Sequence, residues 1–430
     1  MGQGTVSVAS GIQGQVTREE VSEEAVNLIY ICDFPPSNLA GGPILTSRLL
    51  RDYPPGRVVV LTSSRYLRVS PKEGRLACAH VAFPTTTGWG RWGLGRIKNA
   101  IDWLMIPVLT LVTTKVIRNR GNAVILTVAH GRFFLAAALA GWISRTPYIV
   151  MMHDDTFDAK RPSWLLKHVF RPSVRGALRG AAHVYAISSE MQLLLKSEYG
   201  VDSELQKPAT ERNGRNDPAA ARAARDFNCP VILYAGAITG SVEDSLRLLA
   251  QLIVSGKLKD YGLQSAKFHV YTSLGDEQKR TWGWNHDDLV IHPWVSQNEL
   301  PDVLSKADIL FLPFSFSPAA RHSVETSFPS KTADYLASGT PILVFGPNYS
   351  SLVAYARREG FAEIVSEAHA DALATAIKRI ALDPGHREAL SSRALEVFSK
   401  YHDVDQQRAD FLRVLKSIVT KRSCVASRRI

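Results

Sequence analysis

The segment FPSKTADYLASGTP, residues 328–341, carries signals for both the start and the end of a helix. Pro329 suits the first turn of a helix, because the backbone N–H that proline lacks has no partner there anyway. Gly339 is the residue type that ends a helix with a positive φ, and Pro341 opens the apolar run that follows. We therefore expect a helix that begins near Pro329, ends at Gly339 and leads into a strand.

The polar residues of this segment indicate an anion site at the start of that helix. Ser330, Lys331 and Thr332 would present backbone N–H groups at the positive end of the helix dipole, and Lys331 adds a full charge. Asp334 lies one turn further and can accept hydrogen bonds from a diol such as ribose. Glu325 precedes the helix and could reach a sugar hydroxyl. Each residue alone is explained by helix capping, but together they favour a phosphate-binding turn beside a carboxylate.

Around this segment, short apolar runs alternate with helical patterns along most of the chain. The first series of expected strands lies at residues 26–31, 57–62, 124–128, 148–152 and 182–187. The second series lies at residues 231–235, 267–271, 289–292, 309–312 and 342–345. Short, nearly all-apolar strands that alternate with helices are typical of parallel sheets covered on both faces. The pattern predicts an α/β fold with two facing Rossmann-like domains, whose ligands bind outside the carboxyl ends of the strands.

The break between the two series sets the expected domain boundaries. The parts are a flexible polar tail (1–24), a first Rossmann-like domain (25–206), a linker rich in Pro, Ala and charge (207–228), a second Rossmann-like domain (229–402), and a C-terminal helix with a tail (403–430). We expect that last helix to cross back onto the first domain. Residues 97–117 contain charges and a proline, which favours a buried or interfacial helix over a membrane span.

Residues 323–341, SVETSFPSKTADYLASGTP, resemble the donor-binding motif of family 4 (group 1) glycosyltransferases, retaining enzymes of the GT-B fold. In that family one Glu contacts the donor sugar and a second Glu holds the nucleotide ribose. The second position falls here on Asp334 and the first on Thr326, with Glu325 beside it. A branch with a Pro-Ser-Lys turn in this place is the closer match. The resemblance implies a nucleotide-sugar donor bound to the second domain.

The resemblance covers nearly the whole chain after the tail, and it implies further donor contacts. Residues 294–314, which begin at Trp294, resemble the segment that holds the base. The turn AGAITGS, residues 235–241, matches a loop that offers an Arg and a Lys to the diphosphate in the family. Ala237 stands where the Arg is expected, and no Lys is near. The residues left to hold the diphosphate are Lys331, Arg321 and the backbone N–H groups of Thr239, Gly240 and Ser241.

In the first domain, two short motifs follow expected strands. Gly41 and Gly42 permit close backbone approach and positive φ, and the resemblance implies that this pair faces the donor phosphates and the acceptor. Plain turn chemistry explains the pair equally well. His153 ends the fourth strand on the binding side of the sheet, where family members use a His to contact the donor sugar; the alternative is a structural His. We expect a turn-capping role for Asp154 or Asp155.

The resemblance also implies a mechanism. The sugar passes through an oxocarbenium-like state and is transferred with retention by front-face attack, without an enzyme nucleophile. His153 would position the sugar, Lys331 would neutralise the leaving diphosphate, and Glu325 would contact the sugar. Helix dipoles and cations replace a metal in this chemistry, so we expect no metal and no cofactor beyond the nucleotide-sugar substrate. The acceptor is expected to be a glycan or a lipid-linked molecule, in polysaccharide or glycolipid biosynthesis.

Two basic stretches suggest an anionic membrane as a further partner. Residues 88–105 mix Trp89, Trp92 and Trp103 with basic side chains, as suits a membrane interface. Lys167 to Arg179 include basic residues spaced four apart, which places them on one helical face. The alternative is a solvated basic face and a buried Trp cluster.

Bulk properties agree with an intracellular enzyme of two domains. The chain has 430 residues and a formal charge of +11, which favours anionic partners. Its four cysteines form no CxxC pair, which argues against a zinc site or a disulfide framework. The start of the chain does not read as a signal peptide. We expect a cytoplasmic protein, with a peripheral position at the inner face of the membrane as an option.

Other functions compete with this hypothesis. A nucleotide-sugar 2-epimerase or an inverting transferase could share the GT-B fold, and the anomeric linkage of the product would separate them from a retaining enzyme. A non-catalytic nucleotide-sugar-binding protein would explain the missing Arg and Lys after residue 235. Nucleic-acid binding rests on charge alone and is not expected.

Overall fold

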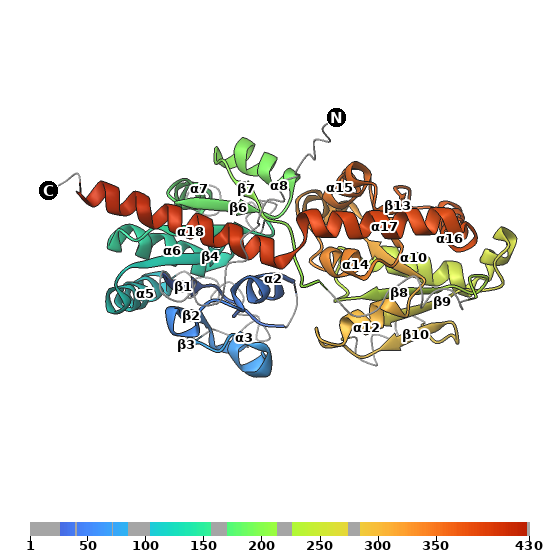
Figure 1. Cartoon of the computed structure of the whole chain (residues 1–430), viewed down its shortest axis with the longest axis horizontal. Helices are drawn as coiled ribbons and strands as arrows, with labels where there is room; N and C mark the ends of the chain where they lie inside the picture. Colours follow the sequence, from blue (N-terminus) through green and yellow to red (C-terminus); the bar gives the residue numbers. More distant parts are fainter. Residues whose placement is uncertain are drawn as a thin grey trace, which may run out of the picture.

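The computed structural model describes residues 26–38, 41–70, 72–84, 104–155, 170–212, 226–273 and 284–427. Two α/β domains lie side by side, and the long helix α18 (Val404–Ser427) reaches from one across the other (Figure 1). The N-terminal tail, the segment 85–103 with Trp89, Trp92 and Trp103, the stretch around Lys167 and most of the expected linker fall outside the described residues.

The first sheet is parallel throughout, in the order β3-β2-β1-β4-β5-β6-β7. Its strands are β1 (Asn27–Ile31), β2 (Val58–Ser63), β3 (Ala79–Phe83), β4 (Ala123–Val128), β5 (Tyr148–Met152), β6 (His183–Ala186) and β7 (Glu204–Leu205). The five expected strands all form. The edge strands β3 and β7 were not predicted, because β3 is short, half-exposed and interrupted by His80, and β7 has only two residues.

The second sheet is also parallel, in the order β10-β9-β8-β11-β12-β13. Its strands are β8 (Val231–Ala235), β9 (Lys267–Tyr271), β10 (Leu289–His292), β11 (Ile309–Pro313), β12 (Ile342–Phe345) and β13 (Ala362–Val365). In both sheets the central strands are almost fully buried, because helices cover both faces. The predicted fold class, two Rossmann-like domains, is confirmed.

The covering helices follow the strands in the usual βα alternation. Those of the first domain are α2 (Gly41–Leu50), α3 (Ser64–Val69), α5 (Ile106–Arg120), α6 (Gly131–Ser144), α7 (Arg171–Arg179) and α8 (Ser189–Leu194). Those of the second are α10 (Glu243–Val254), α12 (Leu300–Ser305), α13 (Arg321–Thr326), α14 (Thr332–Ser338), α15 (Ser351–Glu359), α16 (Ala370–Leu382) and α17 (Pro384–Tyr401). Ser188 caps α8, as expected, by accepting a hydrogen bond from the N–H of Met191 at 3.0 Å.

Two helix starts differ from the sequence analysis. Helix α14 begins at Thr332 and not near Pro329, because the N–H of Thr332 bonds to the carbonyl of Pro329 and closes a turn before the helix. Its end at Gly339, with φ +61°, is as predicted. Helix α2 begins at Gly41, so the glycine pair opens a helix and does not merely form a turn.

The basic face expected on α7 is largely occupied within its own domain. Arg171 forms an ion pair with Glu198, and Arg175 donates to the carbonyl of Glu198. Arg179 donates to the carbonyl of Tyr199 at 3.0 Å. These arginines hold α7 to the turn after α8, so they are poorer candidates for a membrane contact than the sequence suggested.

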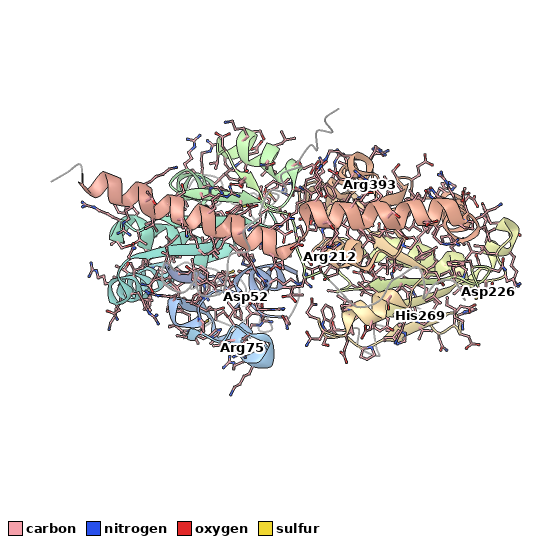
Figure 2. The ribbon with its side chains drawn as sticks, in the orientation of Figure 1. Asp52, Arg75, Arg212, Asp226, His269 and Arg393 are labelled. Carbon is pink, nitrogen blue, oxygen red and sulfur yellow. The ribbon has the colours of Figure 1, made fainter. Side chains whose placement is uncertain are left out.

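Helix α18 packs on the first domain through apolar and charged contacts. Phe411 and Leu415 are buried in the core formed by β1 and its neighbours. Arg408 pairs with Asp52, which Figure 2 labels beside α2, at 2.7 Å, and donates to the carbonyl of Arg48 at 2.7 Å. Among the described residues, no helix combines the length and the apolar character needed to cross a bilayer.

The chain crosses between the domains twice at one place, and His402 joins the two crossings. Its Nδ1 lies 2.6 Å from the carbonyl oxygen of Pro208, so Nδ1 is the donor and Nε2 accepts from the hydroxyl of Tyr355 at 2.8 Å. Backbone hydrogen bonds between Thr210 and residues 402 and 404 complete the junction. Burial lowers the pKa of His402 to about 3, which keeps the ring neutral.

We predict that His402→Ala lowers the free energy of unfolding, because it leaves the Pro208 carbonyl and the Tyr355 hydroxyl without a partner. Each orphaned buried group costs about 1–3 kcal/mol. Urea unfolding measures the loss, and His286→Ala, at an exposed histidine, is the control.

The effect also depends on pH with a definite sign. An unfolded His titrates near pH 6.5, whereas folded His402 stays neutral down to about pH 3. Its contribution to stability is therefore complete above about pH 6.5 and declines as the pH falls toward about 3. The difference in the free energy of unfolding between wild type and His402→Ala should therefore narrow over this pH range. A constant difference would contradict a neutral, hydrogen-bonded His402.

Candidate functional site

A cavity of about 370 Å³ lies where the two domains meet, and both contribute to its walls. The first domain supplies Gly41, Ile44 and Asp154. The second supplies the turn after β8, the ends of β9 and β11, and the start of α14. The cavity thus lies at the carboxyl ends of both sheets, which is where parallel α/β sheets bind ligands.

Several residues predicted from the sequence come together in this cavity, although they belong to separate loops. The predicted residues that line it are Gly41, Thr239, Ser241, Trp294, Ser330, Lys331 and Asp334. The sequence motif and the turn after the first strand of the second domain are therefore parts of one site.

Lys331 reaches from the turn before α14 to the turn after β8. Its ammonium lies 3.8 Å from the centre of the Tyr234 ring. A Cβ added to Gly236, whose φ is +155°, would come within 2.3 Å of Nζ. Only glycine at this position therefore allows the ammonium so close to the backbone.

The charge of Lys331 is not neutralised by a carboxylate within the described residues. Burial lowers the pKa of this lysine from its ordinary value to about 7. A partly desolvated cation that lacks a counter-ion and lines a cavity is suited to bind an anion.

Asp334 is held by an arginine of the other domain. Arg48, on α2, donates from Nη2 to Oδ1 of Asp334 at 2.7 Å, and the two side chains are only 7% and 14% exposed. The same guanidinium contacts Oε1 of Gln297 and donates to the carbonyl of Ala209 at 3.1 Å. Arg48 thereby fixes the orientation of a carboxylate that lines the cavity.

Three further contacts connect the domains beside the cavity. Ser327 donates to Asp154 at 2.5 Å, and Asp155 lies 3.0 Å from Nε2 of His322. Ser188 donates to the carbonyl of Thr326 at 2.6 Å. Asp154 and Asp155 therefore bridge the domains, and the turn-capping role expected for one of them stays a prediction.

His153 lies behind the glycine pair. A Cβ at Gly42 would stand 2.8 Å from its Nδ1, and this buried nitrogen has no hydrogen-bond partner among the described residues. Burial lowers the pKa of His153, and the charge of Asp154 opposes this. The ring is neutral at pH 7 and lies just outside the cavity lining.

Other predicted residues do not line the cavity. Arg321 and Glu325 pair with each other at 2.8 Å across one turn of α13, and Arg321 packs on the ring of Tyr349. Thr332, the first residue of α14, is fully buried, and Gly240 is exposed in the turn after β8. For these residues the roles inferred from the sequence stay predictions.

The structure adds residues that the sequence analysis missed. Tyr271 lines the cavity and stacks on His292 with ring centres 4.2 Å apart. Arg48 and Gln297 are also new. Arg48 is the one charged residue in the apolar pattern of α2, and this isolated charge was the available signal. Nothing in the sequence shows that its partner is Asp334.

Comparison with known proteins agrees with this architecture. A glycosyl transferase 4-like domain matches residues 48–207, and a glycosyl transferase-like domain matches residues 248–413. In a comparison with the curated protein sequences, none matches this chain.

Solved structures of low sequence identity share the fold. HepE of Anabaena, in complex with UDP and glucose, superimposes with a TM-score of 0.60 at 13% identity, over 91% of this chain and 100% of that one. Sucrose-phosphate synthase of Thermosynechococcus elongatus gives 0.66 at 14% identity, over 92% and 99%. α,α-Trehalose 6-phosphate synthase of Burkholderia multivorans gives 0.64 at 12% identity, over 93% and 98%.

We predict that Arg48→Met destabilises the protein strongly. Breaking a buried ion pair by removing one partner costs about 3–5 kcal/mol, because the other charge is left buried. Arg51→Met is the matched control: it removes an arginine just after the end of α2, and the pair of Arg51 with Glu211 is exposed, so it is worth about 1 kcal/mol or less. Thermal unfolding measures the stability of the two variants. Equal losses of stability would contradict the structural role of Arg48.

Proposed function

We propose that this chain, which belongs to the glycosyltransferases of GT-B fold, transfers a hexose from a nucleotide-sugar with retention and without a metal ion. The observation that carries the proposal is the cation of Lys331, which lies against the turn after β8 and lines the interdomain cavity. The enzyme class, a hexosyltransferase, rests on the two glycosyl transferase domains.

The diphosphate of the donor is proposed to bind between Lys331 and the turn after β8. This turn has Ala237 where related enzymes carry an arginine, and Lys331 brings a positive charge to the same place from α14. Thr239 and Ser241 line the cavity beside it. Helix α14 spans only seven residues, so the lysine carries more of the electrostatic stabilisation than the helix dipole does.

The ribose is proposed to bind Asp334. A carboxylate has two oxygens that accept hydrogen bonds, and Arg48 engages Oδ1. Oδ2 remains for a ribose hydroxyl, with Arg48 as the residue that positions the carboxylate.

The base is proposed to lie near the ends of β9 and β10. Tyr271 and Trp294 line the cavity there and offer aromatic surface for stacking. The Anabaena protein was solved with UDP and glucose, which makes a UDP-hexose the first donor to test.

For the transfer step, the leaving diphosphate becomes more negative as the glycosidic bond breaks, and Lys331 stabilises that charge. The neutral imidazole of His153 is proposed to position the sugar. Its neighbour in the chain, Asp154, lines the cavity, so His153 lies next to the site. The acceptor is a glycan or a lipid-linked molecule. The anomeric configuration of the transferred sugar separates retention from inversion.

A non-catalytic nucleotide-sugar-binding protein is the second candidate. Ala237 at the family's arginine position favours it. An assay for hydrolysis of the bound donor separates the two candidates. Slow hydrolysis indicates an enzyme, and no hydrolysis indicates a non-catalytic binding protein.

The proposal predicts that one nucleotide-sugar in a panel of UDP-, GDP-, ADP- and dTDP-sugars raises the unfolding temperature. Binding stabilises the native state by about 2.7 kcal/mol at a hundredfold excess over Kd. Lys331→Met should weaken binding about ten- to hundredfold, as expected for the loss of a charge-assisted contact, and Asp334→Ala should weaken it less.

The exposed Lys306 provides the control variant, Lys306→Met, whose shift should equal that of the wild type. If no donor in the panel shifts the unfolding temperature, the donor site is wrong.

The lowered pKa of Lys331 predicts a pH dependence of donor affinity. Below about pH 7 the lysine is charged before binding. Above this pH, binding requires the uptake of a proton, because the diphosphate raises the pKa of the ammonium. The affinity should fall by up to about tenfold per pH unit above pH 7. Calorimetric titration measures it, and a flat wild-type profile between about pH 7 and pH 9 would contradict the role of Lys331.

A further inference from the structure

One flank of the first domain exposes large apolar side chains, far from the residues that bind the donor. On α5 and just before it, Leu104 is 74% and Leu111 is 69% exposed, and Val108 lies between them on the same helical face. On α6, Trp142 is 78% exposed, with Leu139 and Ile143 beside it. These two helices pack against each other, so their outer residues form one apolar surface, called here the α5–α6 face.

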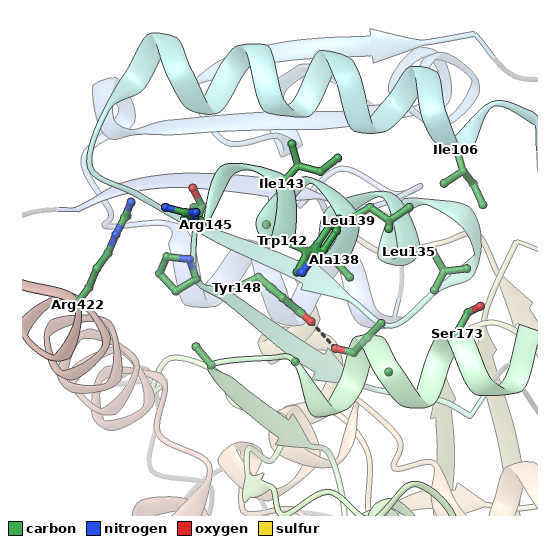
Figure 3. Close-up of a pocket in the computed structure, with 17 residues that line it drawn as sticks. Ile106, Leu135, Ala138, Leu139, Trp142, Ile143, Arg145, Tyr148, Ser173 and Arg422 are labelled. Atoms are coloured by element: carbon green, nitrogen blue, oxygen red, sulfur yellow. Dashed lines mark hydrogen bonds between the residues drawn. The ribbon is translucent and has the colours of Figure 1, made fainter. Parts of the chain in front are cut away.

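The α5–α6 face continues into an open groove between α6 and α7 with a volume of about 1240 Å³. Figure 3 shows Leu135, Leu139 and Trp142 along α6, with Tyr148 and Ser173 below them. Tyr148 donates its hydroxyl to the carbonyl of Ala177 at 2.6 Å and so closes the floor of the groove. Arg145 and Arg422 stand at one end.

The helices that form this face carry charges of one sign only. Helices α5, α6 and α7 contain no aspartate or glutamate, and neither does α18 after Asp410. Exposed basic residues accompany the apolar ones: Lys115 and Arg118 continue the outer stripe of α5 by one and two turns, and Arg145, Lys421 and Arg422 lie beyond α6.

An apolar surface with an exposed tryptophan, a basic rim and no carboxylate on its own helices is complementary to an anionic bilayer. The tryptophan and the aliphatic side chains can enter the interfacial region, and the basic side chains can bind lipid headgroups. A protein partner of ordinary composition would present its own basic and acidic groups, and this rim offers no counterpart to the basic ones. We infer that the α5–α6 face is the membrane-docking surface of this protein, with anionic phospholipid as its partner.

Of the two stretches suggested by the sequence, residues 88–105 adjoin this surface through Leu104, and their part up to residue 103 lies outside the described residues. The described arginines of α7 are engaged by Glu198 and Tyr199, whereas the apolar residues of α5 and α6 are exposed. Helix α6 starts directly after the carboxyl end of β4, at the edge of the sheet that faces the cavity. A bilayer along α6 would therefore reach toward the rim of the cavity, where a lipid-linked acceptor could enter.

Flotation with phospholipid vesicles tests the inference on the full chain. The wild type should float with vesicles of equal parts phosphatidylcholine and phosphatidylglycerol, and much less with phosphatidylcholine alone. Trp142→Glu and Leu111→Glu should each weaken binding at least about tenfold, since each removes a large apolar side chain from the interface and adds a repelled charge. Arg118→Glu should weaken it as well, and binding should decline with salt.

Leu193→Glu is the matched control. Leu193 is 71% exposed in the same domain, but it lies on α8, away from the α5–α6 face, so its substitution should leave vesicle binding unchanged. Donor-induced thermal shifts of the same variants should equal that of the wild type, because no docking residue lines the interdomain cavity. The two proposals can therefore fail separately.

Three results would overturn the inference. The first is a wild type that does not float with the anionic vesicles. The second is floating that Trp142→Glu and Leu111→Glu leave unaltered. The third is a dimer in light scattering that Trp142→Glu dissociates while vesicles are not bound, because the α5–α6 face would then be an interface between two copies of this chain.

Discussion

Among the described contacts between the two domains, the buried guanidinium of Arg48 makes the most hydrogen bonds. It binds Asp334 and Gln297 of the second domain and the carbonyl of Ala209 between the domains. The backbone carbonyl of Arg48 in turn accepts hydrogen bonds from Arg408 of the crossing helix. A buried arginine needs its hydrogen-bond donors satisfied, so these partners must stay in place together. This requirement fixes both the spacing of the two sheets and the position of the carboxylate that lines the cavity.

Two basic residues at the cavity differ in their partners: Lys331 lines the cavity, and Arg48 holds the lining residue Asp334 from outside the lining. Arg48 has its carboxylate and contributes structure, whereas Lys331 has no counter-ion among the described residues and contributes binding capacity. The low pKa of Lys331 follows from that difference, since burial without a partner disfavours the charged form. Gly236 makes the arrangement sterically possible. A positive charge thus reaches the turn after β8 although this turn contains neither arginine nor lysine.

The polar cavity and the apolar surface lie on different parts of the molecule. The carboxyl ends of both sheets form the polar cavity, and the outer helices of the first domain form the apolar α5–α6 face. Because side chains on one face of α6 cover the sheet while those on the other remain exposed, a single helix contributes to the core and to the proposed docking surface. A substrate anchored in a bilayer and a donor dissolved in water could then approach the same cavity from different sides.

Short-range patterns in the sequence determined much of the architecture. Apolar runs of strand length specify the central strands, because a parallel sheet covered on both faces tolerates few polar residues there. Gly339 specifies a helix end through its positive φ, and the spacing of Lys331 and Asp334 places both at one end of α14. Edge strands such as β3 escaped, because a half-exposed strand lacks that uniform pattern.

Tertiary structure decided which side chains meet. Arg48 and Asp334 are 286 positions apart, and no local pattern records such a pair. Arg321 and Glu325 looked available for a ligand, yet they lie one helical turn apart and bind each other. The sequence by itself therefore determined the folds of the two domains and the turn that carries Lys331, which depend on neighbouring residues. Within the described part of the chain, the packing of the domains decided which carboxylate is held, which cation has no carboxylate partner and which helical faces are exposed, because those properties depend on distances between segments remote in the chain.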